Sequence, residues 1–193
     1  METKQSTYPP GDFAIWIIIY IELITFGALF LGYAYTRRLH VELFNDSQLL
    51  LDQRAGFVNT LILITSSWLV VKAVYAIQSF EKDKAINLAS SFLLGSIGLG
   101  CVFLILKIIE FSTKYVQGIN LSTNTFFMFY FVLTIFHFLH VLLGVIILFK
   151  LYQNTKQGLY SKQEHRGLET GASYWHMVDL LWIVLFPLIY IIR

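Results

Sequence analysis

Two histidines stand inside an apolar stretch of the chain, where an ionisable side chain needs a chemical reason. His137 and His140 lie three positions apart in FHFLHVLLG, and residues 125–149 contain no Asp, Glu, Lys or Arg. On a helix, side chains three positions apart share one face. The two imidazoles could ligate a metal or a haem, could handle protons, or could each hydrogen-bond to a polar group on a neighbouring helix. The pair alone leaves these three alternatives open.

Three further ionisable residues, one single and two paired, lie in similar apolar segments. Glu22, in IIIYIELITF, has no basic residue one turn away in its own segment, so it is either protonated or paired across helices. Counted by helical rise from the segment ends, His137 and His140 lie at a depth that suits both as partners of Glu22. In the last apolar segment, His176 and Asp179 are three positions apart and could share a hydrogen bond or a proton.

Lys107 and Glu110 form the fourth group, in LILKIIEF. They too are three positions apart, and they lie near the end of their apolar segment. We expect them to neutralise each other and to reach the membrane surface as an interfacial pair. This interpretation favours an anchoring role over a chemical one.

All of these side chains lie in five long apolar segments, which are residues 13–35, 56–77, 85–111, 125–149 and 172–192. At about 1.5 Å per residue, each segment can cross a hydrocarbon core that is about 30 Å thick. The composition agrees, since 56% of the residues are hydrophobic and 13% are charged, with a mean hydropathy of +0.65. In soluble domains about a quarter of the residues are charged. We therefore predict an all-α integral membrane protein in which residues 1–193 form a single bundle of five transmembrane helices.

The connections between the segments are short and polar, which leaves no room for a soluble domain. Those on the N-terminal side hold seven basic residues (Lys4, Lys82, Lys84, Lys150, Lys156, Lys162 and Arg166), and those on the other side hold five (Arg37, Arg38, Arg54, Lys114 and Arg193). The positive-inside rule then favours a cytoplasmic N-terminus and a C-terminus outside. The net charge of +2 is small and spread through the loops, and it indicates no nucleic-acid partner.

Two smaller predictions concern single residues. Cys101 is the only cysteine and lies in an apolar segment, so it cannot form an internal disulfide, and we expect it to be a small packing residue. Asp12 follows Pro10 and Gly11, which break any preceding helix, so it is a candidate cap for the first helix.

Nearly the whole chain resembles subunit III of the haem-copper oxidase superfamily, in its short five-helix form. The segment around Glu22 resembles the family's first shared helix with its embedded Glu, and NTLILITSS, from Asn59, resembles its Asn-Thr then Ser-Ser helix. FHFLHVLLG resembles the motif His-x-x-His-Val-x-x-Gly. LETGASYWHMVDLLW, with Glu169, Tyr174 and Trp175, resembles the signature Glu-x-x-x-x-Tyr-Trp-His-Phe-Val-Asp-x-x-Trp. The last two motifs are specific.

The chain departs from the family pattern at several positions. Lys107 stands where the family usually has Gln, Phe111 where it has Tyr, and Ile135 and Phe138 where glycines are common. The helix contacts at these positions should therefore differ from those of the family. The two extra N-terminal helices of the long mitochondrial-type subunit have no counterpart in these 193 residues, so a lipid cleft formed with them is not expected.

The resemblance implies an accessory role without catalysis by this chain alone. The family binds no haem or copper itself, packs against the catalytic subunit I that holds them, binds phospholipid and supports proton uptake. The implied partners are subunit I and the other subunits of a terminal oxidase in aerobic respiratory electron transport, or of a nitric oxide reductase, in the bacterial inner membrane. The family's buried or interfacial polar positions, none of them catalytic or metal-binding, fall on Glu22, Glu110, His137, His140, Glu169, His176 and Asp179.

Two functions of other classes compete with this role. A membrane redox protein with haem b needs histidines that face each other from two helices, whereas His137 and His140 share one helix. A proton-coupled transporter could use Glu22 and the histidines as a relay. Five segments without an inverted repeat, and without a pair of Gly- or Pro-broken helices, argue against it.

Overall fold

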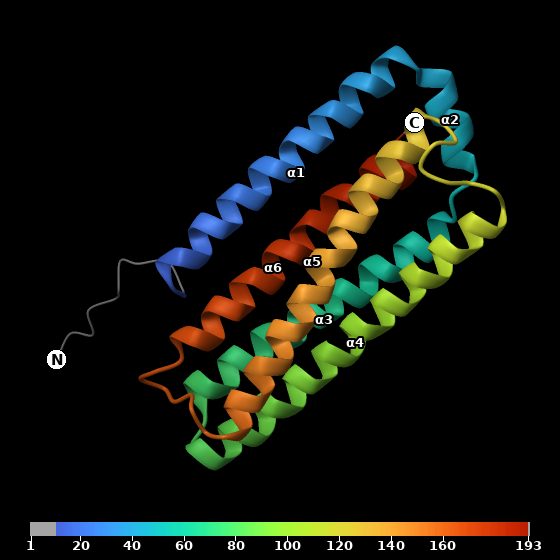
Figure 1. Ribbon diagram of the computed structural model, residues 1–193. Coiled ribbons are helices and arrows are strands. Elements are labelled where there is room, and N and C mark those ends of the chain that lie inside the picture. The colour runs from blue at the N-terminus through green and yellow to red at the C-terminus, as the bar shows by residue number, and fades with distance from the viewer. Residues whose placement is uncertain (1–10, 193) are drawn as a thin grey trace.

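A computed structural model describes residues 11–192, which form six α-helices and one π-helical turn without any strand (Figure 1). In chain order they are α1 (Phe13–Leu39), α2 (Val41–Leu49), α3 (Gln53–Ser79), α4 (Lys82–Val116), α5 (Thr125–Lys156), α6 (Arg166–Phe186) and η1 (Pro187–Ile191). Five helices are long and apolar enough to cross a membrane, namely α1, α3, α4, α5 and α6 with its continuation η1. The predicted all-α, five-helix membrane fold is confirmed.

The helices extend beyond the predicted segments at seven of the ten ends. The segment predicted as 125–149 continues as α5 to Lys156, and the one predicted to begin at residue 172 begins at Arg166. Hydropathy marks only the part of a helix that lies in hydrocarbon, whereas backbone hydrogen bonding continues into polar surroundings until a breaker ends it. Gly118 and Gly158, with φ of 76° and 70°, follow the ends of α4 and α5 in the left-handed conformation that glycine adopts readily.

The connection predicted between the first two spans contains a helix of its own, α2. Phe44 of α2 is buried, and its ring packs against those of Tyr33 and Phe126 at centroid distances of 5.3 and 5.5 Å. The side-chain Nε2 of Gln48 donates hydrogen bonds to the carbonyl oxygens of Ile189 and Ile192, at 2.7 and 3.0 Å. Tertiary contacts therefore stabilise a helix that is too short and too polar to show in the hydropathy pattern.

The two single-residue predictions have different outcomes. Asp12 occupies the N-cap position of α1 as predicted, although its side chain makes no capping hydrogen bond. Its backbone N–H donates to Thr170 Oγ1 at 3.0 Å. Cys101 is exposed on α4 and packs in no core, so the prediction of a packing role is wrong.

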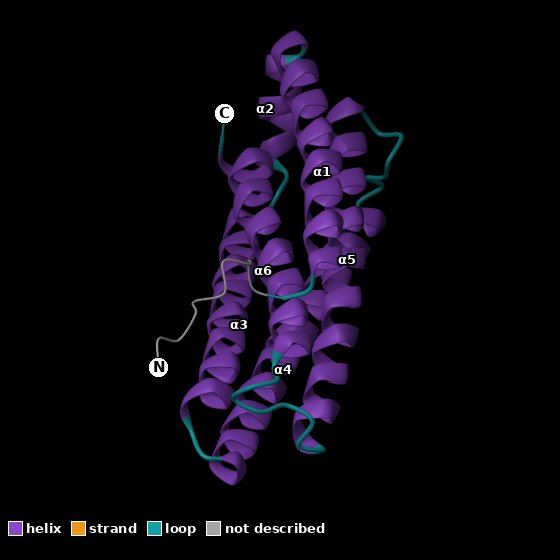
Figure 2. Cartoon of the chain, turned by 90° about the vertical axis from the view of Figure 1, so that its left-hand side faces the viewer, coloured by secondary structure: helices purple, strands orange, loops and turns teal. Residues whose placement is uncertain are grey.

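Four of the spans pack into the central bundle, and α1 lies against one side of it. Each of α3, α4, α5 and α6 contacts two of the others, while α1 contacts mainly α6 and α5 (Figures 1 and 2). Two glycines permit the close packing around Trp175 of α6. A Cβ atom at Gly144 would lie 2.7 Å from the indole ring, and one at Gly100 would lie 3.0 Å from it. Any larger residue at either position would displace this buried ring.

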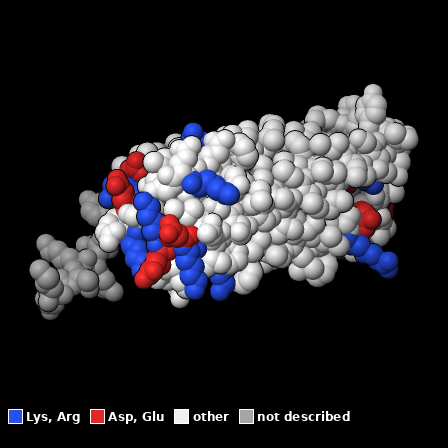
Figure 3. Space-filling view, turned by 90° about the horizontal axis from the view of Figure 1, so that it is seen from below, with Lys and Arg blue, Asp and Glu red and all other residues white. Residues whose placement is uncertain are grey.

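The two ends of the described chain lie at opposite ends of the bundle, as five crossings require (Figure 1). On the face seen in Figure 3, charged side chains gather at both ends, most densely at the end where α1 begins, and the surface between is nearly free of Lys, Arg, Asp and Glu. That uncharged band is the part suited to hydrocarbon. Which end faces the cytoplasm stays a prediction.

Candidate functional site

The carboxylate of Glu22 on α1 meets the imidazole of His140 on α5. Glu22 Oε2 lies 3.0 Å from His140 Nε2, and their side chains are 24% and 10% exposed. Glu22 was expected to meet a histidine of another helix. His140 of α5 is that histidine. This contact ties the peripheral helix α1 to the central bundle.

The other nitrogen of His140 constrains how the pair carries protons. His140 Nδ1 lies 2.7 Å from the carbonyl oxygen of Phe136, which can only accept, so Nδ1 carries a hydrogen. The contact with Glu22 then needs one more proton, either on the carboxyl, which donates to a neutral imidazole, or on Nε2, which donates to a carboxylate. Both arrangements leave the pair neutral overall. The pair can therefore pass one proton between its two members without creating a net buried charge.

His137 has entirely different surroundings. Its side chain is fully buried, and neither ring nitrogen has a hydrogen-bond partner among residues 11–192. The rings of Trp182, Phe103 and Phe26 lie around it at centroid distances of 5.2, 5.8 and 6.5 Å. Although the two histidines share a face of α5, only His140 takes part in a proton-sharing contact.

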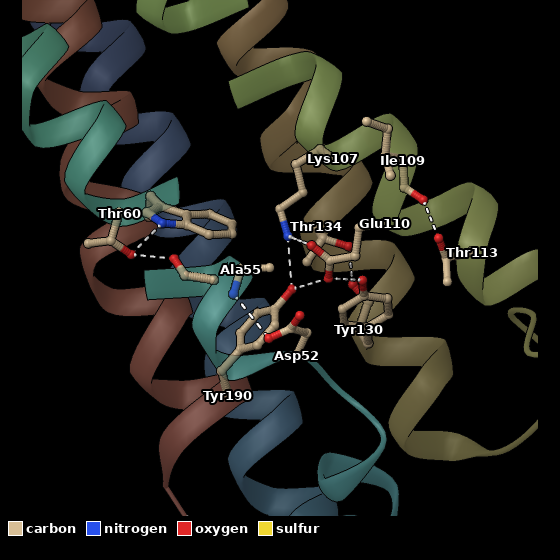
Figure 4. A network of polar contacts seen from close by, with 12 residues as sticks. Asp52, Ala55, Thr60, Lys107, Ile109, Glu110, Thr113, Tyr130, Thr134 and Tyr190 are labelled. Carbon is tan, nitrogen blue, oxygen red and sulfur yellow. Dashed lines mark hydrogen bonds and ion pairs between the residues drawn. The ribbon is translucent and has the colours of Figure 1, made fainter. Parts of the chain in front are cut away.

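Lys107 and Glu110 form the predicted ion pair, with Nζ and Oε2 2.9 Å apart, but its predicted place at the membrane surface is wrong (Figure 4). The two side chains are only 1% and 9% exposed. Because α4 continues to Val116, five residues beyond the predicted segment, Lys107 lies more than one turn deeper than that segment indicated, and its side chain is buried in the bundle. It cannot reach the headgroups, so the pair is a buried cluster and no anchor.

Two tyrosines complete this buried cluster. Tyr130 of α5 and Tyr190 of η1 each donate a hydrogen bond of 2.6 Å to Glu110 Oε1, and Lys107 Nζ also donates to the Tyr190 hydroxyl at 2.8 Å (Figure 4). The ammonium lies 4.6 Å from the centroid of the Trp182 ring, a distance at which the ring face attracts a cation. The cluster thus joins α4, α5 and the end of α6, and each charge has several partners.

Neither of these tyrosines was predicted from the sequence, nor were the polar groups that hold η1 and Trp182. Gln53 Nε2 donates to the carbonyl of Tyr190 at 2.7 Å, and Trp182 Nε1 donates to Thr60 Oγ1 at 2.9 Å. One signal was available, because a buried tyrosine or tryptophan usually needs a hydrogen-bond partner for its polar end. Which partner it finds depends on the packing of helices far apart in the sequence.

His176 and Asp179 lie on one face of α6, but no hydrogen bond joins them in the described part of the chain. His176 Nδ1 instead lies 2.6 Å from Ser67 Oγ on α3. Asp179 Oδ1 is buried and has no hydrogen-bond partner among the described residues. The predicted sharing within the pair is replaced by a contact between helices.

Glu169 hydrogen-bonds to the backbone just before α1. Its Oε2 accepts a hydrogen bond of 3.3 Å from the backbone N–H of Gly11, and its Oε1 accepts one of 3.3 Å from Gln78 and lies 3.1 Å from His165 Nε2. The carboxylate therefore connects three segments at the end of the bundle where α1 begins.

The other three signature residues are buried in the bundle. Tyr174 donates a hydrogen bond of 3.4 Å to the carbonyl of His140, the residue that binds Glu22. Trp175 and Asn59 have side-chain polar atoms that find no partner within residues 11–192. In the same range, no three His, Cys, Asp or Glu side chains are grouped so that they could hold a metal ion.

Comparison with known families decides what this bundle is. The model of a family described as cytochrome c oxidase subunit III matches residues 48–193, from α2 to the end of the chain. This chain belongs to the cytochrome c oxidase subunit III family. The match contains the His137 and His140 helix, the buried Lys107 cluster and the His176 and Asp179 helix. Glu22 lies before it.

Individual subunit III relatives extend the similarity over most of the chain. A cytochrome c oxidase subunit 3 from Thermostichus vulcanus is 33% identical over 177 residues, which cover 91% of this chain and 84% of the relative. A cytochrome bo(3) ubiquinol oxidase subunit 3 from Buchnera aphidicola is 29% identical over 186 residues, covering 93% and 85%. A heme-copper oxidase subunit I+III from Aeropyrum pernix is 30% identical over 188 residues, or 93% of this chain but 22% of the relative.

These findings establish a multi-pass membrane protein of a respiratory oxidase family. The Aeropyrum pernix relative is by its name a subunit I and a subunit III in one chain, and the region similar to this protein is a small part of it. Subunit III of this family therefore works in association with a catalytic subunit I.

Proposed function

We propose that this chain is the non-catalytic subunit III of a haem-copper terminal oxidase, in aerobic respiratory electron transport in the bacterial inner membrane. The observation that carries the proposal is the relative in which subunits I and III form one chain, together with the family match over most of this protein. Haem and copper then belong to the partner subunit. The chain stabilises that partner and takes no part in the chemistry.

A lipid-binding role is part of the proposal. An open groove of about 780 Å³ runs between α1 and α5, and it is lined almost entirely by apolar side chains such as Ile24, Leu29, Phe131 and Phe136. Hydrocarbon chains of a phospholipid suit such a lining. Lipid held there would fill the space between α1 and the central bundle and would stiffen the attachment of α1.

Support of proton uptake by the partner is proposed to depend on the Glu22 and His140 pair. The contact of 3.0 Å can hold one shared proton while it stays neutral, which keeps α1 attached to α5 whichever of the two side chains carries that proton. We propose that the pair, with lipid beside it, maintains the shape of the surface that meets the catalytic subunit.

The proposal is tested by affinity purification of the chain from its native membrane in mild detergent, with a visible spectrum and the masses of the accompanying chains. The expected result is haem absorption together with a large polytopic partner that has the size and sequence of an oxidase subunit I. A nitric oxide reductase partner would contradict the oxidase assignment. A colourless protein without partners would contradict the accessory role and would leave a transporter to be tested in liposomes.

A further inference from the structure

One outward-facing stripe of α6 contains polar side chains at the middle of the membrane. The stripe runs through Ser173, His176, Leu180 and Ile183, which are partly or well exposed, while the residues between them are buried. Figure 2 looks onto α6, which lies between α1 and α3. The other face of α6 packs against the bundle.

Three residues form a polar cluster at this stripe, the Ser67–His176–Asp179 cluster. Ser67 Oγ and His176 Nδ1 are 2.6 Å apart, which leaves the Nε2 of the partly exposed His176 without a partner among the described residues. The Asp179 side chain lies directly below the surface, 9% exposed; its Oδ1 is covered by the bundle and finds no donor within residues 11–192. At the surface itself, the Nε2 of His176 is the hydrogen-bonding position that stays unused, with the Asp179 carboxyl beneath it.

The depth of the cluster excludes a lipid headgroup as the missing partner. Asp179 stands at the middle of the span Arg166–Ile191, and Ser67 at the middle of Gln53–Ser79. At about 1.5 Å per residue, either end of these spans is almost 20 Å away. Hydrocarbon chains neither donate nor accept hydrogen bonds, and ionisable side chains at this depth normally face protein.

We infer that the Ser67–His176–Asp179 cluster is the contact point for a transmembrane helix of the catalytic subunit, and that this helix presents a side chain that pairs with His176 Nε2 at the surface and extends a hydrogen bond to the Asp179 carboxyl beneath it. The identity of the partner rests on the proposed function, whereas the position of the contact rests on the cluster. The outer surface of α4 offers a contrast, because its exposed residues at similar depth, such as Ile105 and Ile108, are apolar and suit lipid.

Photo-crosslinking in the purified complex tests the position of the contact. A benzoylphenylalanine replaces Leu180 in one preparation and Ile105 in the other, since these positions are equally exposed, at 52% and 56%, on α6 and α4. We expect Leu180→benzoylphenylalanine to crosslink to the catalytic subunit at least fivefold more than Ile105→benzoylphenylalanine does. Equal yields, lipid adducts at position 180, or crosslinks from position 105 alone would overturn the inference. In each case the co-purified partner would keep the proposed function intact.

A pair of variants tests the hydrogen bond itself. Asp179→Leu should lower the amount of catalytic subunit retained through washing at least tenfold, while Asp179→Asn, which keeps an acceptor oxygen, should lower it less than threefold. Ser96→Ala serves as the control, because Ser96 is a buried polar residue bonded to Ser66 inside the bundle, at 2.7 Å. Full retention in Asp179→Leu with normal helical circular dichroism would overturn the inference. Loss of the partner from Ser96→Ala to the same degree would do so too. If Asp179→Leu fails to fold, the crosslinking yields decide alone.

Discussion

At the scale of single residues, the bundle neutralises its buried charges in small groups that draw on several helices. Glu22 has His140, and Glu110 has Lys107 with two tyrosines. The sequence predicted which positions carry charge and that each must find a partner. It could not predict the tyrosines, because Tyr130 and Tyr190 reach Glu110 only after α5 and η1 have packed against α4.

Loss of the Glu110 carboxylate should destabilise the protein strongly. Glu110→Gln leaves the buried Lys107 ammonium without a counter-charge, and breaking a buried pair in this way costs about 3–5 kcal/mol. Lys107→Gln, which restores the residue usual in the family, leaves Glu110 with two tyrosine donors and should cost about 1–3 kcal/mol. The measurement is the unfolding free energy of each variant in detergent. A larger cost for Lys107→Gln would contradict the network.

The same substitution should cost more stability at His140 than at His137. His140→Phe removes the partner of Glu22 and should cost about 2–3 kcal/mol. His137→Phe fills a space lined by aromatic rings and removes two nitrogens that lack partners, so its cost should stay below about 1.5 kcal/mol. Thermal unfolding of both variants, followed by tryptophan fluorescence, makes the comparison. A larger loss of stability in His137→Phe than in His140→Phe would contradict this prediction.

At the scale of the elements, the hydropathy pattern predicted all five spans. It did not predict the residues at which most of these helices begin and end. The ends of α4 and α5 depend on Gly118 and Gly158, which adopt positive φ, and not on the change from apolar to polar residues. The misplacement of Lys107 at the surface follows from the same cause, since a helix end drawn at residue 111 lies five residues short of Val116. The hydropathy pattern did not reveal α2, because this short polar helix is stabilised by the packing of Phe44 and not by an apolar sequence of its own.

The end of α6 should depend on α2. Pro187 lacks a backbone N–H and begins the π-helical turn η1. The carbonyl of Ile189 in this turn and that of Ile192 directly after it both accept hydrogen bonds from Gln48. Gln48→Leu leaves two carbonyls without that donor and should cost about 2 kcal/mol. Hydrogen exchange should become faster at the amides of η1 and unchanged at the middle of α6. The exposed neighbour Leu49→Ala is the control, and equal effects of the two variants would refute the coupling.

At the scale of the whole molecule, the N-inside orientation is a prediction from charge. In a Cys101→Ser background, a cysteine at Asn120, between α4 and α5, should react with a membrane-impermeant maleimide on intact spheroplasts. A cysteine at Lys162, between α5 and α6, should react only after the membrane is permeabilised. These two connections lie at opposite ends of the bundle. The reverse labelling pattern would invert the topology and leave the fold unchanged.

The central claim is that this chain serves an oxidase whose haem and copper lie in another subunit. The most direct test records the reduced-minus-oxidised spectrum and the oxygen consumption of the purified assembly, before and after this chain is stripped from it with a harsher detergent. Our account predicts that the haem bands and oxygen consumption stay with the partner and that the released chain is colourless. Haem bands that follow the released chain, or an assembly that consumes no oxygen, would contradict it.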